Sequence, residues 1–134
     1  MITDINIQNL KKAIEQAYLT AELDSDGDIY ITEGLEFPLW VSISEENTVL
    51  KVMTFVNFLE KENVDELKAL RVINRINTNF FPNVVSFNHG KLECHYYALL
   101  EDTMSEKHLL QILRQCASSF VNAVREEDID ELIG

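Results

Sequence analysis

Long apolar runs, cysteines and basic residues are all scarce in this sequence, and each scarcity excludes a class of protein. No apolar segment approaches the roughly 20 residues that a membrane-spanning helix needs. The first residues lack the basic-then-apolar order of a secretory signal. Two cysteines, Cys94 and Cys116, do not make the framework of a disulfide-stapled domain. We therefore expect a cytoplasmic protein that does not act on membranes.

Positive charge is also scarce in this sequence. The chain has 11 Lys and Arg residues against 23 Asp and Glu residues, which gives a net charge of −12. The basic residues are scattered and form no stripe, so the field around the protein repels phosphate backbones. Nucleic acid is not an expected partner.

The remaining composition is that of an ordinary globular protein. Hydrophobic residues make up 46% of the 134 positions and charged residues 25%. A chain of this length buries a sizeable core and falls within the common size of one domain. With no internal repeat or linker, we expect a single domain over residues 1–134.

Hydrophobic periodicity predicts mixed α+β structure. Apolar residues recur at helical spacing over 5–23, with Thr3 or Asp4 as the N-cap. Alternation then predicts three antiparallel strands over 28–33, 39–44 and 49–59. A second helix is expected over 64–80, with Asn63 as its cap. Two strands over 84–87 and 92–100 form a hairpin, and a last helix follows a cap at Thr103 or Ser105. The predicted order is helix-β-β-β-helix-β-β-helix.

The segment Asp24-Ser-Asp-Gly-Asp28 resembles the start of a calcium loop, because alternate carboxylates can converge on a hard cation. Such a loop needs Gly at its sixth position and Glu at its twelfth, and this chain has Ile29 and Leu35 there. A turn is the favoured interpretation, and we predict no metal.

The sequence contains no recognisable catalytic or zinc-binding motif. His and Cys residues occur without the spacing of a tetrahedral zinc site, and neighbours on a strand point to opposite faces. No nucleophile elbow or phosphate-binding glycine loop is present. We expect no catalytic residues, no cofactor and no enzymatic activity. The His and Cys residues that lack this spacing are His89, Cys94, His95, His108 and Cys116.

Two asparagines of the second helix are the most informative polar residues. Asn77 falls inside the predicted apolar arc and Asn74 falls at its edge. Buried amides need hydrogen-bond partners. We interpret both as structural residues whose side chains bond the backbone of the sheet or the following loop.

Strand alternation divides the sheet into two faces of different character. The residues expected to face the helices are aliphatic: Ile29, Ile31, Leu39, Val41, Ile43, Val52 and Val56. The opposite side, here called the outer face, carries Tyr30, Trp40, Met53, Phe55 and Tyr97. A solvated sheet normally presents polar residues, so something else should cover this face. Either a helix crosses to it, or it is a dimer or partner surface.

Four segments of the chain resemble the YbjN family, described as bacterial sensory transduction regulators. They are Asp24-Ser-Asp-Gly-Asp-Ile-Tyr-Ile, Val72-Ile-Asn-Arg-Ile-Asn-Thr-Asn-Phe, Gly90-Lys-Leu-Glu-Cys-His-Tyr-Tyr-Ala-Leu-Leu and Ser105-Glu-Lys-His-Leu-Leu. The resemblance spans residues 10 to 126. It implies the fold of type III secretion chaperones, whose members are small, acidic and dimeric. Trp40 and the missing Gly before the last helix depart from the family pattern.

Three functions follow as hypotheses. The first is a non-catalytic regulator or chaperone-like protein, a homodimer, that binds a partner protein through its sheet. The second is a dedicated type III secretion chaperone for an effector. The third is a small-molecule or ion-responsive sensor that uses the turn from Asp24 to Asp28.

Overall fold

The computed structural model describes residues 1–58, 66–80 and 83–127, which form three helices and six strands. The α+β fold class is confirmed. The elements in chain order are α1 (Ile7–Gln16), β1 (Thr20–Leu23), β2 (Ile29–Glu33), β3 (Leu39–Ile43), β4 (Val49–Asn57), α2 (Glu66–Asn79), β5 (Val84–Asn88), β6 (Lys91–Leu99) and α3 (Glu106–Glu127).

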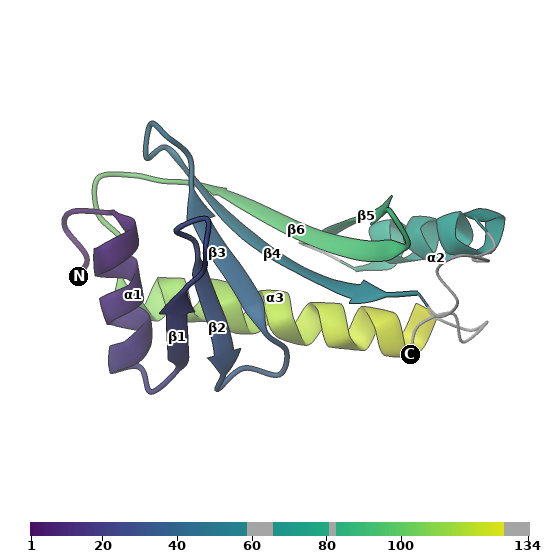
Figure 1. Ribbon diagram of the computed structural model, residues 1–134, viewed down its shortest axis with the longest axis horizontal. Coiled ribbons are helices and arrows are strands. Elements are labelled where there is room, and N and C mark those ends of the chain that lie inside the picture. The colour runs from purple at the N-terminus through teal and green to yellow at the C-terminus, as the bar shows by residue number, and fades with distance from the viewer. Residues whose placement is uncertain (59–65, 81–82, 128–134) are drawn as a thin grey trace.

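The six strands form one antiparallel sheet in the order β1-β2-β3-β4-β6-β5. Its longest pairing joins β4 and β6, which stay in register from Val49 opposite Leu99 to Asn57 opposite Lys91. The sheet twists along this pair, as Figure 1 shows. One end of the pair carries β3, β2 and β1, and the other end carries β5.

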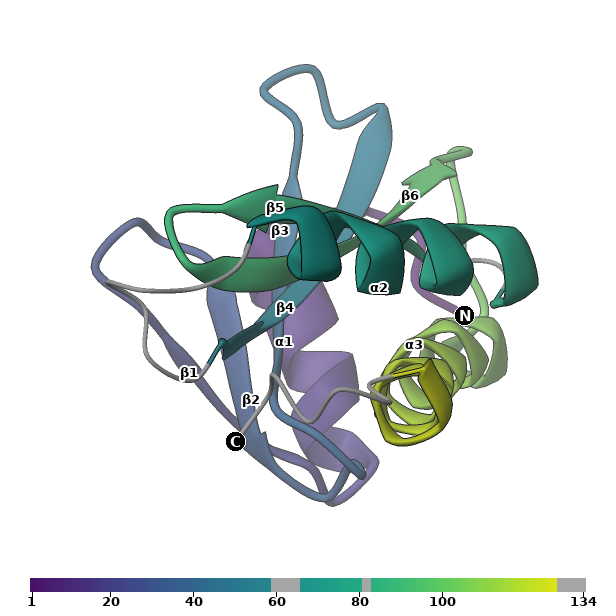
Figure 2. The ribbon, with the colours of Figure 1, turned by 90° about the vertical axis from the view of Figure 1, so that its right-hand side faces the viewer.

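The helices share one side of the sheet. In Figure 1, α3 runs along most of the molecule, while α1 and α2 lie toward its opposite ends. Figure 2 shows α2 and α3 near each other at the β5 end, where they also make direct contact. Within the described ranges, none of the helices combines the length and apolar character needed to cross a bilayer.

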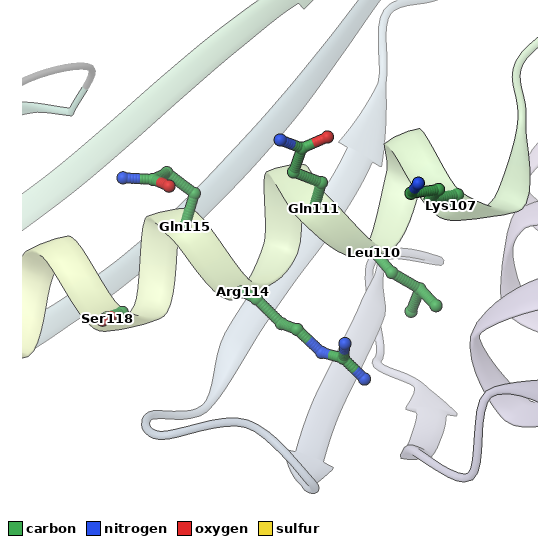
Figure 3. Close-up of a pocket in the computed structure, with 6 residues that line it drawn as sticks. All are labelled: Lys107, Leu110, Gln111, Arg114, Gln115 and Ser118. Atoms are coloured by element: carbon green, nitrogen blue, oxygen red, sulfur yellow. The ribbon is translucent and has the colours of Figure 1, made fainter.

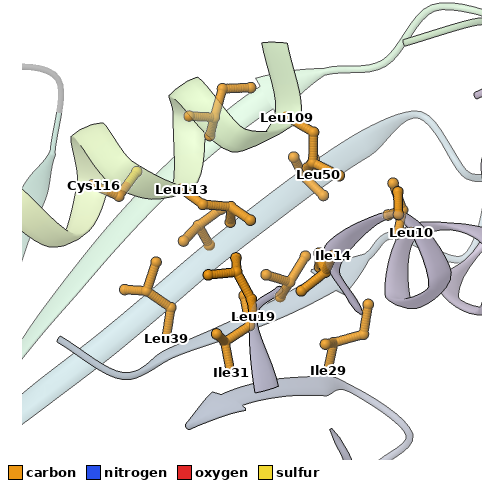
Figure 4. Packing of buried hydrophobic residues seen from close by; sticks show 14 of the residues in the cluster. Leu10, Ile14, Leu19, Ile29, Ile31, Leu39, Leu50, Leu109, Leu113 and Cys116 are labelled. Atoms are coloured by element: carbon orange, nitrogen blue, oxygen red, sulfur yellow. The ribbon is translucent and has the colours of Figure 1, made fainter. Parts of the chain in front are cut away.

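The buried core has two parts that follow this division. In the larger part, side chains of α1 and α3 meet the inner residues of β2, β3 and β4 (Figure 4). In the smaller part, Val72 and Ile76 of α2 meet Leu92 of β6 and Phe120 of α3. Phe37 packs against both parts. Because α3 contributes to both, it joins the two ends of the molecule.

The first predicted helix is too long, and a strand was missed. The helix ends at Gln16, and Tyr18 adopts a left-handed conformation with φ of 66°. The chain then pairs along β2 as β1. The apolar residues Tyr18 and Ala21 continued the helical spacing, but Tyr18 is exposed and Ala21 packs against the core from β1. Tertiary pairing outweighed local periodicity here.

Helix caps were predicted in part. The N-cap of α1 is Asn6, not Thr3 or Asp4, and its side chain accepts a hydrogen bond from the Asn9 N–H at 2.8 Å. At α3, Ser105 Oγ accepts from the His108 N–H at 3.0 Å, as one of the two predicted caps requires. The predicted cap Asn63 lies outside the described residues.

Candidate functional site

Pairing between neighbouring strands places the side chains of the outer face next to one another. Tyr30 of β2 lies opposite Trp40 of β3, and Trp40 lies opposite Met53 of β4. Met53 lies in turn opposite His95 of β6. Because side chains alternate along each strand, these residues project from the same side of the sheet, together with Phe55.

Three rings on this face form a continuous stack. The ring centroids of Tyr30 and Trp40 are 4.4 Å apart with an interplanar angle of 8°. Those of Trp40 and Phe55 are 5.4 Å apart at 22°. The Lys91 Nζ lies 4.4 Å from the centre of the Phe55 ring, which places a cation at the end of the stack. We call these four side chains the aromatic ladder.

The ladder determines what the outer face can offer a ligand. Trp40 is flanked by Tyr30 and Phe55, so the ring faces are largely used within the ladder. All three rings are half-buried for this reason. The Trp40 ring therefore offers a ligand mainly its edge, which suits close packing with apolar side chains and does not suit insertion of a nucleobase beside it.

A second ring pair extends the outer face toward the end of β6. The His95 and Tyr97 rings lie parallel, with centroids 6.1 Å apart. His95 Nε2 is 3.3 Å from a carboxylate oxygen of Glu93. Tyr97 is 59% exposed, which makes it the most accessible ring of the face. The outer face therefore runs from β2 across to β6.

No helix covers the outer face in the part of the chain that the structure describes. The buried helical residues pack against the aliphatic inner residues of the strands. None of the five outer-face residues belongs to either buried part of the core. The alternative in which one of the three helices crosses to this side is therefore wrong for the described residues.

The three aspartates between β1 and β2 form a hydrogen-bonded turn. The Asp24 carboxylate accepts from the backbone N–H groups of Asp26 and Asp28, both at 2.9 Å. Carboxylate oxygens of the three residues lie within 4.8 Å of one another. Desolvation and the carboxylates of Asp24 and Asp26 raise the pKa of Asp28, and Lys51 partly opposes this rise. The turn geometry alone accounts for the cluster.

The His and Cys residues do not converge. Cys94 and Cys116 are buried on the inner side of the sheet, whereas His95 lies on the outer face. His89 is at the β5–β6 turn and His108 is exposed on α3. Among the described residues, no group of His and Cys side chains has metal-binding geometry. Burial raises the pKa of both thiols to about 12, so they remain protonated at neutral pH.

The two asparagines of α2 are exposed, so the prediction that they are buried is wrong. The apolar face of α2 is centred on Ala69, Val72 and Ile76, which turns both amides outward. Asn77 nevertheless bonds the sheet: its Nδ2 donates to the Val85 carbonyl at 3.0 Å, and its Oδ1 accepts from the Val85 N–H at 2.8 Å. The Asn74 side chain has no hydrogen bond with a described residue.

Sequence reasoning missed two members of the outer face. His95 precedes Tyr97 by two residues and Lys91 precedes it by six, so both share its side of β6. Strand alternation could have identified them. The stacking itself could not be predicted, because it depends on the register between β2, β3 and β4.

Comparison with known proteins identifies a family and a shared fold. A family model named YbjN, "Putative bacterial sensory transduction regulator", matches residues 6–126. Among curated proteins, none matches the sequence significantly. A crystal structure of YbjN from E. coli, described as a putative transcription regulator, superposes with a TM-score of 0.74 at 10% identity. That match covers 100% of this chain and 99% of the other, and it shows a shared fold. The likeness to type III secretion chaperones stays a prediction.

Proposed function

Because this chain belongs to the YbjN family, we propose that it is a non-catalytic cytoplasmic regulator that binds a partner protein through its outer face. The observation that carries this proposal is the aromatic ladder on a sheet face that no described helix covers. The family description concerns regulation. The choice of a protein partner rests on the chemistry of the face.

Aromatic and Met side chains are enriched at protein interfaces, where they offer large contact areas, and each aromatic side chain has only two rotatable bonds. In the ladder, Tyr30, Trp40 and Phe55 already hold one another in place. Binding would therefore require little further ordering of these side chains, which favours affinity. A second copy of the chain is one protein that this face could accept, and a different regulatory protein is another.

The experiment compares wild type with Trp40→Ala/Phe55→Ser, which removes the centre of the ladder. We expect the variant to remain folded but to lose self-association in light scattering, or to lose a partner that wild type retains in a pull-down from the native cytosol. Leu70→Ser is the matched control, because Leu70 is an exposed apolar residue (52%) on the helical side. It should behave as wild type.

A second outer-face variant distinguishes loss of binding from loss of folding. Tyr97→Glu places a charge on the outer face at a side chain that is 59% exposed and makes no ladder contact. It should weaken the same association without lowering the thermal midpoint. If both outer-face variants keep the mass and partners of wild type, the outer face is not the binding surface.

A further inference from the structure

One flank of α3 lies beside the turn between β2 and β3. Figure 3 shows that the side chains in the middle of α3 diverge, so that Arg114 and Gln111 point to opposite flanks. At helical spacing, the flank of Arg114 continues to Val121 and Arg125. Glu36 of the β2–β3 turn lies beside Arg114 in one hollow and beside Arg125 in the next. This flank of the helix therefore borders two neighbouring hollows.

The hollow beside the end of α3 is mainly apolar and has a volume of about 300 Å³. We call it the flank groove, lined by Glu36, Phe37, Val56, Phe120, Val121, Val124 and Arg125. The ring of buried Phe120 meets the ring of Phe37 edge to face, with centroids 5.5 Å apart. Val121 is half-buried but belongs to neither part of the core. The groove thus has apolar walls that the described residues leave partly open.

The sequence after α3 contains apolar residues that do not fit a continued helix. Residues 128–134, here called the tail, are Asp-Ile-Asp-Glu-Leu-Ile-Gly and lie outside the described residues. At about 100° per residue, a continued helix would place Ile129, Leu132 and Ile133 about 110 to 150° from the midpoint of Phe120 and Ala123. Phe120 and Ala123 are buried residues of α3. All three apolar side chains of the tail would then face away from the core.

The flank groove is within reach of the tail. Val121 precedes Glu127 by six residues, which is about 9 Å along the helix axis. A chain reversal takes about four residues, and each extended residue after it covers about 3.3 Å. A reversal over 128–131 would therefore direct Leu132 and Ile133 back toward Val121. We propose that the tail folds back along α3 and buries Leu132 and Ile133 in the flank groove.

The tail is a better occupant of this groove than a segment of another chain. Its attachment to α3 gives it an effective concentration of about the millimolar range, which a free segment rarely reaches. Charge does not select the occupant, because Glu36 and Arg125 carry opposite charges at the same groove. Arg125 has no ion pair with a described residue, but an exposed pair with an acidic residue of the tail would contribute little. The proposal depends on apolar burial and is independent of the outer face.

The first test measures proximity by disulfide formation in the full chain. Val121→Cys/Ile133→Cys places one thiol in the flank groove and one in the tail. Asn122→Cys/Ile133→Cys is the matched control, since Asn122 is exposed and does not line the groove. With glutathione disulfide as the oxidant, the groove pair should close within one chain about tenfold faster than the control pair, because their effective concentration is higher. Cys94 and Cys116 are buried and are retained in both variants. Equal rates, or links only between chains, overturn the proposal.

The second test keeps the natural cysteines and measures exposed apolar surface with the dye ANS. Leu132→Ser/Ile133→Ser should open the groove and raise the dye fluorescence severalfold, while the circular dichroism spectrum stays that of wild type. Asp130→Ser/Glu131→Ser is the matched control, because it changes the neighbouring tail positions and keeps the apolar pair. It should bind the dye as wild type does. If the tail is solvated, or if an external segment is the occupant, the Leu132→Ser/Ile133→Ser signal will be unchanged or lower, and either result overturns the proposal.

Discussion

Asn77 closes an open edge of the sheet. Val85 lies in the edge strand β5, and its N–H and C=O are both bonded by the side-chain amide of Asn77. This amide occupies the position that a further strand would otherwise take. Exposed edge strands are templates for unwanted pairing, and covering them is a common protection.

Replacing this amide tests its role. Asn77→Leu should lower the free energy of unfolding by about 0.5 to 1.5 kcal/mol, because two hydrogen bonds are lost at a site that water can reach. Chemical denaturation would measure the change. Asn74→Leu is the matched control, since the Asn74 side chain is exposed on the same helix and has no hydrogen bond with a described residue. Equal denaturation midpoints for the two variants would show that Asn77 does not secure the edge.

Asp28 is a residue whose charge opposes folding. Its pKa is raised, first by desolvation and then by Asp24 and Asp26. A carboxyl with a raised folded-state pKa is destabilising when ionised. The penalty is fully present above the folded-state pKa and disappears as the pH falls below the ordinary value of 3.8.

Asp28→Asn should therefore raise the thermal midpoint at pH 7, and the gain should shrink toward zero below pH 3.8. Glu45→Gln removes one charge from another exposed turn and serves as the control for net charge. Calorimetry across this pH range would follow both variants. A gain that persists unchanged at low pH would show that electrostatic relief at Asp28 is not the cause.

The elements of this fold differ in how well local sequence predicts them. The hairpin of β5 and β6 was predicted from its Asn-His-Gly turn, and His89 and Gly90 indeed have positive φ of 49° and 76°. The break between α1 and β1 was not predicted. It contains no Gly or Pro, and only the left-handed Tyr18 marks it. Because a Tyr residue rarely adopts a left-handed conformation, the local sequence does not indicate that the helix ends there.

The segment between α1 and β1 packs closely against the turn between β2 and β3. Gly34 has φ of 106°, and a Cβ built on it would lie 2.4 Å from Leu19 Cδ2 and 3.3 Å from Leu19 Cα. Leu19 is buried immediately before β1. The small residue at 34 allows the two segments to approach closely, which helps place β1 on the edge of the sheet.

Gly34→Ala should lower the free energy of unfolding by about 2 to 4 kcal/mol, since it adds both backbone strain and overlap with Leu19. Gly27→Ala separates the two effects, because Gly27 also has positive φ (82°) but would meet nothing within 4 Å. It should cost only about 1 kcal/mol. Equal losses from the two substitutions, measured by denaturation, would mean that the close approach to Leu19 is unimportant.

The whole molecule has two unlike sides. All three helices pack on the inner side of the sheet, which gathers the buried aliphatic residues into the core. The outer side keeps Tyr30, Trp40, Met53, Phe55 and Tyr97. Alternation in the sequence predicted which residues share this side. Whether a helix covered them could not be predicted, because that depends on how connections between elements pass around the sheet.

The central claim is that the outer face is where this regulator binds its partner, and photo-crosslinking in cells tests it most directly. A p-benzoylphenylalanine placed at Tyr97 would report on the outer face, and the same group at Leu70 would report on the helical side. The two positions have similar exposure, at 59% and 52%. Irradiation should give a discrete protein adduct at position 97 that is absent at position 70. Adducts only at position 70, or the same adducts at both, would contradict the claim.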